Sequence, residues 1–279
     1  MFDKPQVHET QQVRNIEQYH IRPTEELTFQ KVRKPALDNI NKLSKSYKTR
    51  LYEELQQGTA ILQNEYQADS YLYAYGRMHQ AKLLSAFRSI SDIGILPDEQ
   101  NIQVIDYGCG QGIGSIVFLD YLRSLQLKVN ISQIKLIEPS NIALMRATRN
   151  INFHFSYIEK RTDITTIHKK LDNIEAHELT TNSEAIKFHI FSNILDIHDF
   201  DLNSLCEKIA KSQAGKNYFI CVSPNFIRTN AWWRNERLNM VMNYFTNHHA
   251  ANTISTRETD IASGTNGWKR YERLFHAFL

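Results

Sequence analysis

The stretch VIDYGCGQGIGS, Val104 to Ser115, decides the fold of this chain. Glycine occupies every second position from Gly108 to Gly114, and an apolar run that carries Asp106 precedes it. The 279 residues include only ten glycines, so this cluster marks a special turn. Glycine has no Cβ and allows backbone angles and close approaches that other residues forbid. The stretch therefore predicts a strand, a tight turn and a helix, with a ligand against bare backbone and an acid beside it.

Apolar runs alternate with amphipathic segments on either side of this turn. Strands that alternate with helices imply a mostly parallel sheet with both faces covered. The sequence therefore predicts an α/β fold, a Rossmann-like, doubly wound, mostly parallel sheet of seven strands. We expect these strands near residues 102–107, 133–138, 153–157, 187–193, 217–222, 252–258 and 271–279.

The first part of the chain differs from the rest. It is polar and contains no glycine before Gly58, and residues 31–50 carry seven basic side chains and one acidic one. We expect residues 1–69 to form an N-terminal helical extension that acts as a lid, and residues 70–279 to form the core. The basic stretch is either a solvated helix surface or a surface for a phosphate-bearing partner such as RNA.

Composition limits the class of protein. A net charge of +3 is too small to indicate nucleic-acid binding by itself. The cysteines Cys109, Cys206 and Cys221 are odd in number and not at metal-ligand spacing, so we expect free thiols and no metal site. No apolar run approaches the ~20 residues of a membrane span. We therefore expect a soluble, cytoplasmic protein without a membrane partner.

Two classes of cofactor use a glycine turn of this kind. Dinucleotide sites favour the pattern G-x-G-x-x-G, but Ile113 or Ser115 stands at the third glycine position in the two possible registers. An acid two residues before the first glycine is also unfavourable beside a pyrophosphate, whereas it suits a ligand with a cationic amine. The turn therefore indicates a ligand other than a dinucleotide.

The stretch resembles the first motif of the class I S-adenosylmethionine-dependent methyltransferases, and LIEPS, which follows the next predicted strand, resembles their second motif. The resemblance covers the core region and implies S-adenosylmethionine as the cofactor. It implies that Asp106 interacts with the methionyl end of the cofactor, directly or through water. Gly108 and Gly110, with Gly112 in the same turn, then lie beneath the cofactor, and Glu138 accepts hydrogen bonds from both ribose hydroxyls.

The same resemblance suggests three further cofactor contacts. Asp163 is our candidate for the acid that follows the third strand near the adenine, and its alternative role is to cap a helix over residues 164–171. Tyr75 and Arg77 lie on the helix before the first motif, and Arg77 is a candidate partner for the cofactor carboxylate. The alternative is a tyrosine-rich packing surface with a solvated arginine.

In this family the segment after the fourth strand lies near the transferable methyl group. It holds Asn193, Asp196 and His198 here, and His198 is a candidate general base. An ordinary surface position for His198 and helix capping for Asp196 are the alternatives. The segment lacks the proline and aromatic residue that nucleic-acid and protein amine methylases often carry there, which argues against methylation of an exocyclic adenine amine.

The resemblance thus predicts a methyltransferase. We expect a small-molecule acceptor, because the N-terminal extension is positioned to act as a lid over the pocket. RNA is an alternative acceptor, because of the basic stretch and of Trp232 and Trp233, one of which is a candidate to line an acceptor pocket. Cofactor binding without catalysis, as a subunit of a larger assembly, is a second alternative. Aminopropyl transfer from the decarboxylated cofactor is a third, and it gains weight if Arg77 points away from the site.

Overall fold

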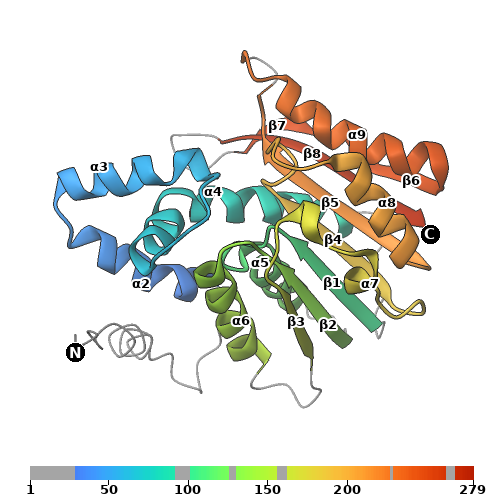
Figure 1. Cartoon of the computed structure of the whole chain (residues 1–279), viewed down its shortest axis with the longest axis horizontal. Coiled ribbons are helices and arrows are strands. Elements are labelled where there is room, and N and C mark those ends of the chain that lie inside the picture. The colour runs from blue at the N-terminus through green and yellow to red at the C-terminus, as the bar shows by residue number, and fades with distance from the viewer. Residues whose placement is uncertain (1–28, 92–100, 126–129, 156–161, 227–228, 262–267) are drawn as a thin grey trace, which may run out of the picture.

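The computed structural model describes residues 29–91, 101–125, 130–155, 162–226, 229–261 and 268–279, so the first 28 residues of the predicted extension lie outside it. One mixed sheet forms its centre (Figure 1). Its strands are β1 (Asn101–Tyr107), β2 (Asn130–Ile137), β3 (Asp163–Ile167), β4 (Ile186–Ser192), β5 (Lys216–Pro224), β6 (Ala250–Ser255), β7 (Glu258–Ile261) and β8 (Trp268–Phe278).

The strands lie in the order β3-β2-β1-β4-β5-β8-β6. The first five are parallel to one another, and β8 is antiparallel to β5. This order, with one antiparallel strand inserted near the edge, is that of the class I methyltransferase fold. The predicted doubly wound, mostly parallel α/β sheet is confirmed.

The outer edge of the sheet is one interrupted strand. β6 pairs with the second half of β8, where Ser255 lies opposite Leu274, and β7 pairs with the first half, where Glu258 lies opposite Tyr271. Counted as one strand, β6 and β7 bring the sheet to the seven predicted strands. β8 follows both of them in the chain, yet it lies between β5 and β6.

The third strand does not lie where the sequence predicts it. The helix α6 (Asn141–Phe155) continues into the predicted strand at 153–157, whose last two residues are outside the described ones, and the strand is β3. Residues 164–167 read Ile-Thr-Thr-Ile, and β-branched side chains favour strands over helices. The alternative prediction of a helix over residues 164–171 is therefore wrong.

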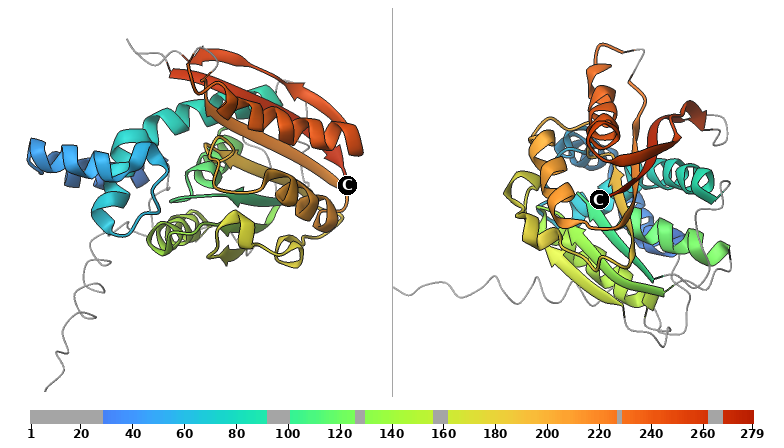
Figure 2. Two further views of the ribbon diagram at one scale, coloured as in Figure 1. Left: turned by 45° about the horizontal axis from the view of Figure 1, so that its top comes forward. Right: turned by 90° about the vertical axis from the view of Figure 1, so that its right-hand side faces the viewer.

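Helices cover both faces of the sheet. They are α2 (Phe29–Asn41), α3 (Lys45–Glu54), α4 (Glu65–Ser91), α5 (Ile113–Ser124), α6, α7 (Ala176–Leu179), α8 (Leu202–Ser212) and α9 (Trp233–His248). α4, α5 and α6 share one hydrophobic core with one face, and α8 and α9 share another with the opposite face. Figure 2 shows α4 and α5 across the sheet from α8 and α9.

The N-terminal helices α2 and α3 pack on the first half of α4, at one end of the sheet (Figure 1). A buried network holds this end of α4. Arg146 of α6 pairs with Glu65 and, at 2.8 Å, with Asp69, and Asn39 of α2 donates to Asp69 over 2.8 Å. α4 runs unbroken through the predicted domain boundary at residues 69 and 70, so extension and core share one helix.

We expect Arg146→Met to destabilise the protein by about 3–5 kcal/mol, because it removes the cation of a buried ion pair with Asp69. Both side chains are only 4% exposed. Arg50→Ala is the matched control, since the pair Arg50–Glu54 is 63% and 37% exposed and such pairs contribute only ~0.3–0.5 kcal/mol. Urea denaturation of the two variants measures both effects, and equal losses would contradict the assignment.

Candidate functional site

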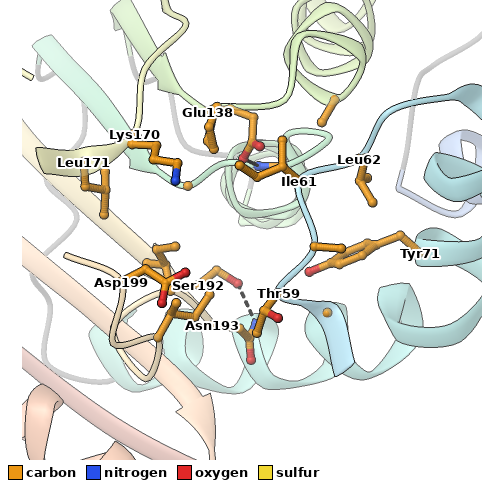
Figure 3. A pocket seen from close by; sticks show the side chains of 18 of the residues that line it. Thr59, Ile61, Leu62, Tyr71, Glu138, Lys170, Leu171, Ser192, Asn193 and Asp199 are labelled. Carbon is orange, nitrogen blue, oxygen red and sulfur yellow. Dashed lines mark hydrogen bonds between the residues drawn. The ribbon is translucent and has the colours of Figure 1, made fainter. Parts of the chain in front are cut away.

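A cavity opens at the carboxyl edge of the sheet, where the turns after β1, β2, β3 and β4 meet (Figure 3). Its empty volume is about 910 Å³ with the part open to solvent included. Residues 58–62, between α3 and α4, close one side, and Tyr71 of α4 points into it. The position matches the expectation that ligands bind beyond the carboxyl ends of parallel strands.

The glycine turn forms the floor of this cavity. Gly108, Gly110 and Gly112 all have positive φ, between 52° and 79°. A Cβ on Gly108 would lie 2.7 Å from the side chain of Ile194, and one on Gly112 would press on Ala147. A Cβ on Gly110 would meet nothing within 4 Å, because Gly110 faces the open cavity. Gly108 and Gly110 line the cavity, whereas Gly112 lies behind it against α6.

Asp106 lies under the turn and is 1% exposed. Its Oδ2 accepts hydrogen bonds from the backbone N–H of Ser115 at 2.9 Å and from the Ser115 hydroxyl at 2.7 Å. Burial raises the pKa of Asp106 to about 7. The carboxyl of Asp106 therefore fixes the first turn of α5. It does not line the cavity, although the resemblance suggested it as a cofactor contact.

Glu138, directly after β2, lines the cavity as the sequence predicts (Figure 3). Its Oε2 accepts from the N–H of Gly110 and its Oε1 accepts from the N–H of Ser140, both at 2.9 Å. Burial raises the pKa of Glu138, and the two backbone hydrogen bonds oppose that rise. Each carboxylate oxygen keeps a free acceptor site, so the group can still bind two donors.

Asn193, directly after β4, is the predicted catalytic candidate that lines the cavity. Its φ is +57°, a conformation that asparagine tolerates better than most residues with a side chain. Its N–H donates to Val222 over 2.7 Å, and its amide Nδ2 donates to the Ser192 hydroxyl over 3.0 Å (Figure 3). Lys82 Nζ of α4 donates to Asn193 Oδ1 over 3.3 Å. The neighbours thus hold the strained residue in one orientation.

The other two catalytic candidates lie outside the cavity lining. Asp196 is buried and its Oδ2 lies 2.7 Å from Arg234 of α9, so it forms an ion pair instead of capping a helix. His198 is exposed and its ring packs edge-on against Trp233 at 4.5 Å. Asp199, the next residue, lines the cavity instead. The segment curls after β4, so residues one position apart face different surroundings.

Three predicted cofactor contacts are also not brought to the cavity lining. Arg77 is exposed, with its guanidinium 5.8 Å from the ring centre of Trp268. Tyr75 is half-buried on α4 and packs beside Gly58. Asp163 begins β3 and accepts from the Gln133 amide over 2.9 Å, which places it at the amino end of the strand, away from the cavity. The misplaced third strand explains this last difference.

Several residues at the site are not among the predicted site residues. Lys170 follows the true third strand and lines the cavity. Tyr71 lines it from α4, and burial raises its pKa. Lys82, on the same helix, is fully buried beside Asn193, and burial lowers its pKa to about 7. Polar residues at helical spacing within an apolar stretch of α4 were the available signal.

Other expectations concern what a site of this kind lacks. The three cysteines are buried and free. Within the ranges that the structure describes, no group of three or more His, Cys, Asp or Glu side chains is placed to hold a metal ion. None of the described helices combines the length and apolar character needed to cross a membrane.

No protein-family profile matches the sequence, and no curated protein matches it. Several solved structures resemble this chain at low sequence identity. The plantazolicin methyltransferase BpumL, in complex with SAH, is 10% identical with a TM-score of 0.46, over 87% of this chain and 98% of that one. A SAM-dependent methyltransferase of Leishmania major is 12% identical with a TM-score of 0.45, over 82% of each chain. The citrinin polyketide synthase CMeT domain is 12% identical with a TM-score of 0.49, over 83% and 64%.

We expect Asp106→Asn to alter the pH dependence of stability. The pKa of Asp106 rises from 3.8 to about 7 on folding, so the folded protein holds this proton more tightly than the unfolded chain. The resulting stability is complete below about pH 4 and is lost as the pH rises through 7. The wild type should therefore lose free energy of unfolding relative to the variant across this window. Urea denaturation between pH 4 and pH 8 measures this, and a difference that stays constant with pH would contradict the assignment.

Proposed function

We propose that this protein is an S-adenosylmethionine-dependent methyltransferase that acts on a small-molecule acceptor. The observation that carries the proposal is the carboxylate of Glu138, which faces the same cavity as the bare backbone of Gly110. The fold and the resemblance of two sequence motifs support the choice of cofactor.

The residues present fit this cofactor. Glu138 keeps two acceptor sites beyond its bonds to Gly110 and Ser140, and the two vicinal hydroxyls of a ribose are matching donors. Because glycine has no Cβ, the space above Gly110 is open to a ligand, and a side chain at this position would intrude into it. Glu138 would hold the ribose, and Gly108 and Gly110 would let the rest of the molecule lie close to the backbone.

The bound cofactor would supply a methyl group on a positively charged sulfur. The chain's own task is then to hold the acceptor in line with that group and to exclude water. Asn193 stands at this end of the cavity in a fixed orientation, and its amide can orient the acceptor. Asp199 is the nearby carboxylate in the lining, so it replaces His198 as the candidate to receive a proton.

A small acceptor is favoured over RNA by the lining of the cavity. None of its lining residues comes from the basic stretch 31–50. Arg33 of that stretch donates to the backbone oxygens of Leu72 and Tyr73, so it serves the packing of α2 on α4. Lys34, Lys42 and Lys45 are exposed, as in a solvated helix surface.

Calorimetric titration with S-adenosylmethionine, S-adenosylhomocysteine and NAD tests the proposal. We expect the first two to bind and NAD not to bind. Glu138→Gln should weaken both sulfur ligands about 10- to 100-fold, because hydrogen bonds to a charged group contribute ~1.5–3 kcal/mol. Asp163→Asn is the matched control and should bind normally, since that carboxylate lies at the opposite end of its strand. Binding of NAD alone would refute the proposed function, and weakening by Asp163→Asn would restore the original expectation for that residue.

A further inference from the structure

Lys82 is a buried cation that the proposed function has not used. It lies on α4 and is 0% exposed, so it stands behind the cavity lining and reaches it through Asn193, a lining residue. Tyr71, on the same helix, lines the cavity. Eleven residues separate the two, which is about three helical turns and ~16 Å along the axis. α4 therefore runs beside the cavity, with Tyr71 nearer the Glu138 side and Lys82 at Asn193.

Few groups satisfy the Lys82 ammonium. Among the described residues its one hydrogen bond is the donation to Asn193 Oδ1, which is long at 3.3 Å, and an ammonium group has three donors. The opposing charge that acts on Lys82 is that of Asp196, whose Oδ2 is already paired with Arg234 at 2.7 Å. A buried cation without a close anion is costly, so this one is suited to an anion that arrives with a ligand.

The cavity lining shows where such an anion would come. Along the sheet edge the lining passes from Glu138 after β2, over Gly108 and Gly110 after β1, to Asn193 after β4. These turns span two strand spacings, or ~10 Å. A nucleoside whose ribose lies on Glu138 can therefore extend a short tail across the glycines to the end where Lys82 lies.

We propose that this end of the cavity is a carboxylate subsite in which Lys82 supplies the positive charge. The inference rests on the proposed function. A carboxylate there would exchange the long bond to Asn193 for a shorter, charge-assisted one, and the flexible four-carbon stem of lysine permits the small shift needed. Two sources offer this group, the methionyl carboxylate of the cofactor and a carboxylate of the acceptor. Arg77, the cation suggested by the sequence, is exposed beside Trp268.

Two probe ligands separate this role from mere structural support. S-adenosylhomocysteine carries the carboxylate, whereas 5′-methylthioadenosine keeps the adenosine and the thioether and lacks the amino-acid end. We expect Lys82→Met to weaken S-adenosylhomocysteine about 10- to 100-fold and to leave 5′-methylthioadenosine within twofold. Lys82→Arg, which keeps the charge, should recover part of the loss. Arg77→Met is the matched control on the same helix and should leave both affinities unchanged.

A second arm distinguishes the sources of the carboxylate. If Lys82→Met leaves S-adenosylhomocysteine unaffected, acetate is added to the protein saturated with that ligand. A rise in the thermal midpoint in the wild type that is absent in Lys82→Met would assign the subsite to the acceptor. Equal weakening of both nucleosides would overturn the subsite, because it marks a purely structural lysine. The subsite would also be overturned if Lys82→Met changed neither the affinity for S-adenosylhomocysteine nor the rise in thermal midpoint with acetate.

The first titration also separates the two proposals. Wild-type protein that binds neither nucleoside would refute the proposed function, and the subsite would fall with it. Wild-type protein that binds both, with no dependence on Lys82 in either arm, would refute the subsite alone. The stability of Lys82→Met is measured alongside, and we expect it to fold, because an apolar side chain of similar length replaces a buried charge.

Discussion

Two backbone N–H groups bind the carboxylate of Glu138, one from each of the turns that follow β1 and β2. This pair of hydrogen bonds ties the floor of the cavity to the group that faces it. Burial disfavours the charge on Glu138, whereas the two donors favour it. The same two hydrogen bonds therefore fix the shape of the turn and favour the ionised form of Glu138. Gly110 contributes to both, because it donates its N–H and, without a Cβ, leaves the cavity side of the turn open.

Local chemistry in the sequence was sufficient for most of the fold. β1, β2, β4 and β5 lie where apolar runs between turn signals predict them, because a buried parallel strand needs nearly continuous apolar residues. The predicted position of the third strand was wrong because aromatic residues at 153–155 suit either a strand or the end of a helix. The preceding helix continued through them, and the β-branched run at 164–167 formed the strand. Choosing between them depends on packing that no short window contains.

The same distinction between local sequence signals and tertiary packing applies to the site residues. Glu138 and Asn193 were predictable because each follows a strand directly, and the carboxyl ends of parallel strands meet at one edge. Residues on α4 were not, because the face of a helix turned toward a cavity is set by tertiary packing. Arg77 lies six residues from Tyr71, about one and two-thirds turns, which carries it off the face that Tyr71 presents. Lys82 lies about three turns beyond Tyr71, so it returns to the face of α4 that Tyr71 presents.

The place of β8 in the sheet has a consequence for synthesis on the ribosome. β5 is complete at Pro224, but its partner begins only at Trp268. At ~5–20 residues per second the emerging chain carries β5 with an open edge for several seconds, while β6 emerges with no neighbour to pair with. An open edge rich in apolar side chains is a template for wrong pairing between chains. The nascent protein is therefore most exposed to aggregation just before its last described strand appears, and slower translation of that interval lengthens the risk.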